Sequence, residues 1–121
     1  MKRIMIVDDD QSMRNIYRDI FDKYRQDYSI EIFPDPRKAF KMLKEEKFDL
    51  VITDIIMEPM DGETFFVTIS NDSGLRNLPV LVVTVLSRDE LDQHFNKKTA
   101  EFLQKPFSEL ELLSKLQELI R

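Results

Sequence analysis

Short apolar runs alternate with longer amphipathic segments along the whole chain, and this alternation constrains the fold more than any other feature. The apolar runs cover residues 4–7, 29–33, 49–53, 79–85 and 100–104. Most of them are continuous rather than alternating in polarity, which is typical of parallel strands that are covered on both faces. We therefore predict five parallel β-strands at these positions.

The segments between the apolar runs have the spacing of amphipathic helices. In the first of them, apolar residues recur every three or four positions, at Met13, Ile16, Tyr17, Ile20, Phe21 and Tyr24. Similar faces occur within 39–43, 65–69 and 110–119, whereas 88–96 carries only Leu91 and Phe95 and predicts a short, weakly anchored helix. Asp35 is placed to cap the second helix, and Ser108 with Glu111 forms a possible capping box for the last.

Strands that alternate with helices in this way predict an α/β fold with a doubly wound, flavodoxin-like parallel sheet of five strands and five helices. The chain is 121 residues long and contains no low-complexity stretch or repeat. That length suits one domain. We therefore expect a single domain over residues 1–121.

Composition excludes several classes of function. The chain has no cysteine, which removes disulfides, thiolate metal sites and cysteine nucleophiles. Its two glycines, Gly62 and Gly74, cannot supply a GxGxxG or GxxxxGK phosphate loop. A net charge of −5 argues against a domain that binds nucleic acid directly. The apolar runs are too short to span a membrane, and residues 1–4 do not resemble a signal peptide, so we expect a cytoplasmic protein.

Polar residues with useful chemistry follow four of the five predicted strands. The first strand ends at Asp8-Asp9-Asp10, the third at Asp54, the fourth near Thr84 and the fifth at Lys105. The second ends at Phe33-Pro34 and offers no reactive group. In open α/β sheets, ligands bind beyond the carboxyl ends of the strands. A strand order of 2-1-3-4-5 places the four functional ends side by side, and we predict that order.

The predicted set of side chains has the parts needed for phosphoryl transfer. Three converging carboxylates, Asp8, Asp9 and Asp54, favour a hard divalent cation such as Mg²⁺. Lys105 supplies a compact positive charge for a phosphate or a carboxylate, and Thr84 supplies a hydroxyl donor. Carboxylates form aspartyl-phosphate intermediates, so we predict Asp54 as the nucleophile.

The sequence resembles the receiver domains of bacterial two-component response regulators over essentially its whole length. The resemblance rests on the joint order and spacing of several short pieces: Ile6-Val7-Asp8-Asp9 with Ser12-Met13-Arg14, Asp49 to Asp54 with Met57 and Met60-Asp61-Gly62, Leu78-Pro79-Val80 leading to Thr84, and Phe102 to Phe107. Each piece alone is a weak pattern, whereas their combination is specific.

The resemblance implies a role for each matching residue. Asp54 matches the phosphoacceptor, and Asp8 and Asp9, with the backbone carbonyl of Ile56, match the Mg²⁺ ligands. Thr84 and Lys105 match the residues that contact the phosphoryl group. Thr84 and Phe102 match the switch pair of the family. Pro106 matches a proline that follows a cis peptide bond.

The resemblance also implies partners and a mode of action. A sensor histidine kinase or a phosphotransfer protein would donate the phosphoryl group. The change would reshape the face formed by the fourth helix, fifth strand and fifth helix, which a downstream protein, an output domain or a second copy would bind. The domain would act as a switch rather than as a turnover enzyme.

Some features depart from the family pattern and leave alternatives open. Val85 stands where the family usually has a small residue, and the proline of the loop after Asp54 comes one position late, at Pro59. A receiver-like interaction module that is never phosphorylated is one alternative. A haloacid-dehalogenase-type phosphatase that uses Asp8 is another, because residues 8–12 imitate its nucleophile motif, although Asp54 would then have no role.

Overall fold

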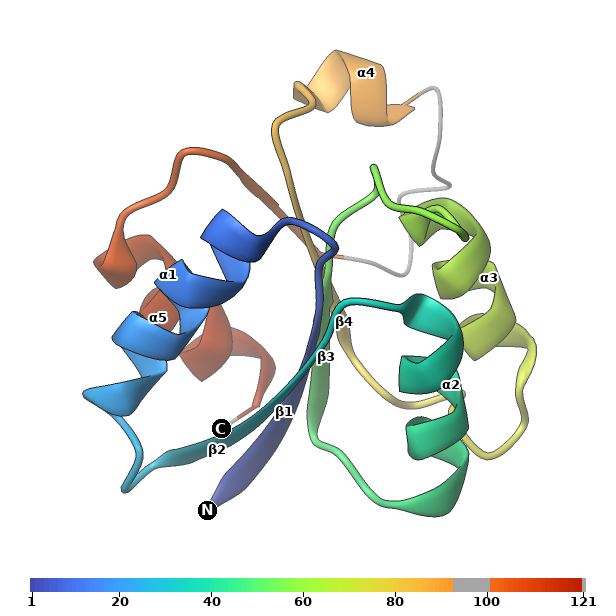
Figure 1. Cartoon of the computed structure of the whole chain (residues 1–121), viewed down its shortest axis with the longest axis horizontal. Helices are drawn as coiled ribbons and strands as arrows, with labels where there is room; N and C mark the ends of the chain where they lie inside the picture. The colour runs from blue at the N-terminus through green and yellow to red at the C-terminus, as the bar shows by residue number, and fades with distance from the viewer. Residues whose placement is uncertain (93–100, 121) are drawn as a thin grey trace.

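The computed structural model describes residues 1–92 and 101–120, and its strands form one parallel sheet in the order β2-β1-β3-β4-β5 (Figure 1). This is the flavodoxin-like order that the sequence predicts, and it leaves β2 at one edge of the sheet. The strands are β1 (Lys2–Val7), β2 (Tyr28–Phe33), β3 (Leu50–Thr53), β4 (Val80–Thr84) and β5 (Glu101–Gln104).

Helices cover both faces of the sheet. Helices α1 (Gln11–Asp22) and α5 (Glu109–Leu119) lie on one face, and α2 (Pro36–Glu45) and α3 (Gly62–Asn71) lie on the other (Figure 1). The short helix α4 (Arg88–Asp92) stands beyond the carboxyl ends of the strands. Within the described residues, no helix is both long enough and apolar enough to cross a membrane.

Two apolar cores result from this arrangement and explain the continuous apolar strands. In β1, Ile4 and Ile6 pack in the core beneath α1 and α5, while Met5 and Val7 pack in the core beneath α2 and α3. All four side chains are fully buried. Burial of such a side chain contributes about 1.5–3 kcal/mol relative to exposure, so strands covered on both faces need apolar residues at every position.

Short-range caps fix where the helices begin. Asp10 caps α1, Asp35 caps α2 and Asp61 caps α3, each through a carboxylate that accepts a backbone N–H. Ser108 and Glu111 form the predicted capping box of α5. The polar strand-to-helix turns therefore start each helix at a defined residue beyond the strand ends.

The structure adjusts some predicted boundaries. Strand β1 begins at Lys2 and β2 at Tyr28, because the backbone pairs these polar residues as neighbours in the sheet even though no apolar pattern marks them. Strands β3 and β4 are shorter than predicted, covering Leu50–Thr53 and Val80–Thr84. The predicted helix over 88–96 is observed as Arg88–Asp92, and residues 93–96, with Ala100 of the predicted fifth strand, lie outside the described part of the chain.

Candidate functional site

The sheet brings the ends of β1, β3 and β5 together at its carboxyl edge. The ammonium nitrogen Nζ of Lys105 lies 2.7 Å from Oδ2 of Asp54 and 3.3 Å from Oδ2 of Asp8. These three residues are far apart in sequence, yet one ammonium bridges both carboxylates. The parallel order is the cause, because neighbouring strands end at the same edge.

The carboxylate of Asp54 is held from two sides. Its Oδ1 accepts backbone N–H groups from Ile55 at 2.6 Å and Ile56 at 3.3 Å, and its Oδ2 faces Lys105. Asp54 is 8% exposed, whereas Asp8 is 1% exposed. The site therefore holds Asp54 almost buried, with one of its oxygens fixed by the backbone and the other by the lysine.

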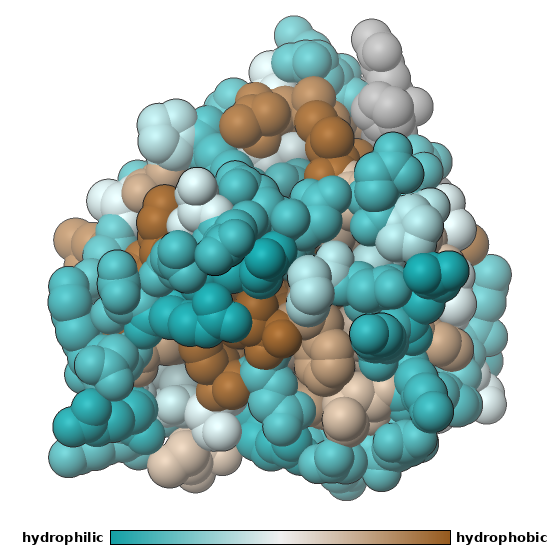
Figure 2. Space-filling view, viewed as in Figure 1, coloured by the Kyte–Doolittle hydropathy of each residue, from teal (hydrophilic) through white to brown (hydrophobic). Residues whose placement is uncertain are grey.

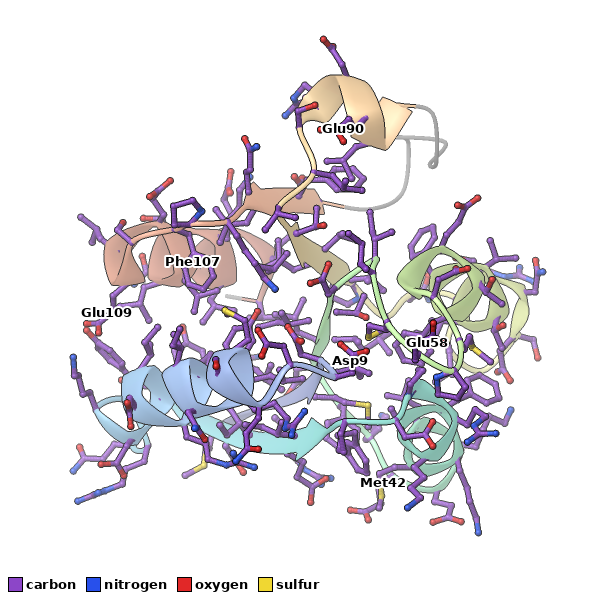
Figure 3. All side chains as sticks on the ribbon, turned by 45° about the horizontal axis from the view of Figure 1, so that its top comes forward. Asp9, Met42, Glu58, Glu90, Phe107 and Glu109 are labelled. Atoms are coloured by element: carbon purple, nitrogen blue, oxygen red, sulfur yellow. The ribbon has the colours of Figure 1, made fainter. Side chains whose placement is uncertain are left out.

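Asp9 lies at the rim of the site. It is exposed, and its Oδ2 accepts the backbone N–H of Glu58 at 3.0 Å, which ties the end of β1 to the loop between β3 and α3 (Figure 3). In residues 1–92 and 101–120, no three Asp, Glu, His or Cys side chains are grouped tightly enough to hold a metal ion. The predicted ligand set of Asp8, Asp9, Asp54 and the Ile56 carbonyl therefore stays a prediction.

The chemistry of the donors nevertheless fits a hard divalent cation. Asp8 and Asp54 offer carboxylate oxygens, and they share a single ammonium group as their salt-bridge partner among the described residues. Two carboxylates against one ammonium leave an excess of negative charge in a nearly buried pocket. Mg²⁺ prefers oxygen ligands and binds through one or two carboxylates, so it suits such a site.

Burial and charge shift the pKa values at the site. Burial is the main cause that raises the pKa of Asp8, against the backbone hydrogen bond from Asp10 and the charge of Lys105, which lower it. For Lys105, burial lowers the pKa, but the hydrogen bond and charge of Asp54, together with Asp8, outweigh burial and leave it raised. Lys105 therefore stays protonated, while burial disfavours the ionised form of Asp8.

This direction predicts the effect of neutralising Asp8. A raised pKa in the folded state means that ionised Asp8 lowers stability as the pH rises above its ordinary value of 3.8. We therefore expect Asp8→Asn to raise the midpoint of thermal unfolding at neutral pH in metal-free buffer, and the gain to disappear below the ordinary pKa of Asp8. Asp19→Asn, at an exposed carboxylate on α1, is the matched control and should change little. A variant that is less stable than wild type at neutral pH would contradict the expectation.

Thr84 and the segment after β5 complete the wall of the site. Thr84 is fully buried, its carbonyl accepts the backbone N–H of Lys105 at 2.7 Å, and its hydroxyl accepts the N–H of Leu86 at 3.4 Å. The Lys105-Pro106 peptide bond is cis, as is Glu58-Pro59. Phe102 is half-buried against the core under α2 and α3, and its switch role stays a prediction.

Sequence reasoning missed three residues around the site. The Arg14 guanidinium donates to the backbone carbonyl of Asp8 at 3.0 Å. Tyr17 is buried under the site and stacks on Phe107 with 6.2 Å between ring centroids, and burial with the nearby charges of Asp8 and Asp54 raises its pKa. Gly62 packs against the backbone of Asp54. Arg14 and Gly62 belong to the motifs that carry the resemblance, and Tyr17 lies on the apolar face predicted for the first helix, but no pattern in the sequence places it near Asp8 and Asp54.

Two exposed apolar side chains belong to loops that leave the strand ends of the site. Ile56, two residues after Asp54, is 58% exposed, and Val85, directly after Thr84, is 60% exposed. Neither side chain is buried in the core. Val85, the departure from the family pattern, therefore lies at the surface, directly after buried Thr84.

Fold and site together define a class of protein: a doubly wound α/β domain that holds a nearly buried aspartate against a lysine at the carboxyl edge of its sheet. Comparison with protein families identifies that class. The model of the response regulator receiver domain matches residues 4–117, and the chain belongs to this family. Receiver domains are in general signalling modules rather than enzymes.

Individual relatives agree with this assignment. The chain is 30% identical to response regulator MprA of Mycolicibacterium vanbaalenii over 98% of its own length and 50% of that protein. It is 29% identical to sensor histidine kinase TmoS of Ectopseudomonas mendocina, again over 98% of the chain but 12% of the kinase. The chain thus spans half or less of these two curated relatives.

Solved structures show the same architecture. Chemotaxis protein CheY4 of Vibrio cholerae superimposes with a TM-score of 0.88 at 27% identity, covering 99% of each chain. The receiver domain of sensor histidine kinase PA1611 from Pseudomonas aeruginosa superimposes with a TM-score of 0.85 at 20% identity, over 98% of this chain and 96% of that one. That structure carries a magnesium ion in its active site cleft.

Proposed function

We propose that this chain is a phosphorylation-dependent signalling switch that accepts a phosphoryl group on Asp54. The observation that carries the proposal is the position of Asp54 itself, with Oδ2 2.7 Å from Lys105 Nζ and Oδ1 bonded to two backbone N–H groups. Family membership supports it, because two-component signalling is what receiver domains serve. A carboxylate held in this way is oriented before a phosphodonor arrives.

In the proposed reaction, a carboxylate oxygen of Asp54 attacks the phosphorus of a phosphohistidine on a sensor histidine kinase or phosphotransfer protein. The O–P bond forms as the P–N bond breaks, and the imidazole nitrogen keeps the electron pair and takes up a proton. Lys105 stabilises the negative charge on the transferred group, and buried Thr84 lies at the end of the neighbouring strand. Asp8 and Asp9 add negative charge beside Asp54, and their proposed role is to bind a metal ion.

We propose Mg²⁺ as the cofactor, held by Asp8, Asp9, Asp54 and the carbonyl of Ile56. When bound, the ion supplies positive charge that offsets the negative charge of the carboxylates and of the incoming phosphoryl group. Support comes from the oxygen donors of the pocket, and from the magnesium ion in the fold relative PA1611.

The consequence of phosphorylation that we propose is a population shift on the face formed by α4, β5 and α5, with Thr84 and Phe102 as the switch pair. A downstream protein, an output domain or a second copy of the chain would read that face. We also propose that the protein is cytoplasmic and that this domain does not bind nucleic acid directly. Receiver domains are found in kinases and in response regulators, as TmoS and MprA illustrate.

Incubation with phosphoramidate and Mg²⁺ tests the proposal. We expect intact mass spectrometry to find one added phosphoryl group on the wild type and none on Asp54→Asn, because the variant lacks the nucleophilic carboxylate. Asp61→Asn, at the exposed cap of α3, is the matched control and should still be labelled. A wild type without adduct would indicate a non-phosphorylated module. Turnover of phosphomonoesters that is lost in Asp8→Asn and kept in Asp54→Asn would indicate a phosphatase.

A further inference from the structure

Strand β2 leaves one edge of the sheet open. Among the described residues it pairs with β1 alone. The carbonyls of Asp27 and Phe33 accept the N–H groups of Lys2, in β1, and of Asp8, directly after β1. Because main-chain groups of alternate residues point to opposite sides of a strand, the N–H and C=O groups of Ile30 and Ile32 face away from the sheet. All six residues of β2 are partly exposed.

Strand β2 has few of the devices that usually protect an edge strand. Its sequence contains neither proline nor lysine, and its one charged residue is Glu31. That carboxylate is engaged by the guanidinium of Arg3 at 3.3 Å. Natural proteins blunt exposed edges with charges, prolines or bulges, since an open edge is a template for a further strand. The β2 edge keeps this capacity.

An apolar strip runs along the same edge. Figure 2 shows a brown strip over β2 with paler brown beside it toward α2. The half-buried residues that supply it include Ile30, Ile32, Phe33 and, from α2, Met42 (Figure 3). Beside the strip on the α1 side lies a groove of about 400 Å³, lined among others by Phe21, Tyr28 and Ile30.

The border of this strip is cationic although the protein as a whole is acidic. Arg18 and Arg25 line the groove, and Arg14 lies one turn before Arg18 on α1. Arg25 is paired with Asp22 at 3.1 Å, but Arg14 and Arg18 donate to neutral oxygens, the Asp8 carbonyl and the Asn15 side chain. In a chain of net charge −5, the α1 side of the edge is therefore complementary to anions.

This charge also argues against a second copy as the occupant. An antiparallel two-fold pairing of β2 with β2 keeps both α1 helices on the same face of the joined sheet, so the arginine rims of the copies would meet. Like charges that face each other across an interface oppose association. An acidic strand meets no such opposition.

We propose that the β2 edge binds an extended acidic peptide segment of a partner protein as a sixth strand. The backbone of the segment pairs with Ile30 and Ile32, its apolar residues cover the strip, and its carboxylates contact Arg14 and Arg18. This is strand addition, in which main-chain hydrogen bonds give affinity and alternate side chains give specificity. Strand β2 and Arg18 lie outside the group of Asp8, Asp54 and Lys105, and Arg14 contacts that group through the backbone carbonyl of Asp8. The proposal therefore does not depend on phosphorylation.

A fluorescein-labelled peptide of alternating Glu and Val, about eight residues long, is the probe. In fluorescence anisotropy we expect it to bind about tenfold more tightly than an alternating Lys and Val peptide, or than the Glu and Val peptide with two central prolines. Amide hydrogen exchange by NMR should slow at Ile30 and Ile32 by about tenfold when the probe binds. Equal binding of the control peptides, or unchanged exchange at these two amides, overturns the proposal.

Variants test the cationic border. Arg18→Glu should weaken probe binding by about tenfold, whereas Arg76→Glu, in the loop after α3, makes the same change of charge away from β2 and should not. Labelling by phosphoramidate should be the same in all three proteins, which separates this test from that of Asp54. Two results would overturn the assignment of the occupant. One is a dimer in analytical ultracentrifugation whose formation slows amide exchange at Ile30 and Ile32. The other is slowed exchange at these amides when duplex DNA replaces the peptide.

Discussion

Gly62→Ala is expected to destabilise the protein by about 1–3 kcal/mol and to slow labelling of Asp54 by phosphoramidate. A Cβ on Gly62 would overlap the backbone carbonyl oxygen of Asp54 and come within 2.7 Å of the Cα of Ile55. Both contacts are backbone, so no flexible side chain can move aside. Either α3 or the Asp54-Ile55 peptide must shift, and displacement of a reacting group by about 1 Å can cost 100-fold in rate.

Gly74→Ala is the matched control for this prediction. The nearest atom to a Cβ at Gly74 is Oδ1 of Asp72 at 3.3 Å, the end of a side chain in an exposed loop. We expect a change of unfolding free energy within about 0.5 kcal/mol and unchanged labelling. Neither glycine has a positive φ, so the requirement at Gly62 is one of space rather than of backbone conformation. Equal behaviour of the two variants in urea unfolding and in labelling would refute this account.

Lys105→Met should destabilise the protein strongly. It leaves Asp8 and Asp54 without their shared ammonium, in a pocket where the side chains of Asp8, Asp54 and Lys105 are 2%, 10% and 12% exposed. Removal of one partner from a buried charge group costs about 3–5 kcal/mol. Urea unfolding at neutral pH in metal-free buffer measures the loss, and methionine keeps the aliphatic length of the side chain.

Two further measurements separate a charge effect from a packing effect. Lys105 lowers the pKa of Asp8, so its removal raises that pKa further, and the loss of stability should shrink as acid protonates the carboxylate. Mg²⁺ should stabilise the variant more than the wild type, because the cation replaces the missing charge. Lys115→Met on α5, where the ammonium pairs with Glu101 and Glu118 at 3.5 Å, should cost about 1 kcal/mol or less. A loss that is independent of both pH and Mg²⁺ would show that charge is not the cause.

The central strands could be predicted because burial on both faces makes each of them a continuous apolar run, and the strand order because four of the five strand ends carry functional residues. Each residue of β3 or β4 is buried, so the apolar run in the sequence contains the strand and exceeds it by one residue at the start of β3 and at each end of β4. The start of β1 could not be predicted from apolar residues, because Lys2 and Arg3 are held by backbone pairing that does not depend on side-chain type. Edge strand β2 is half-buried throughout, and its mixed composition reflects this.

The convergence of Asp8, Asp54 and Lys105 could likewise be predicted, because parallel strands end at one edge. Their individual contacts could not. Asp8 and Asp9 are neighbours in sequence, yet one carboxylate is buried against Lys105 and the other meets the backbone of Glu58 at the surface. Which of the two turns inward depends on residues 97 and 49 positions away, respectively.

The sequence by itself determined the alternation of strands and helices, the strand order and the edge at which the acidic residues and the lysine gather. These follow from hydrophobic burial and chain connectivity, which act over neighbouring residues. Only the tertiary structure decided which oxygen of Asp54 faces Lys105, why Gly62 admits no side chain, and that an apolar strip with a cationic border lies open along β2. Those properties arise from contacts between distant segments, and no local pattern encodes a distance between atoms that folding alone brings together.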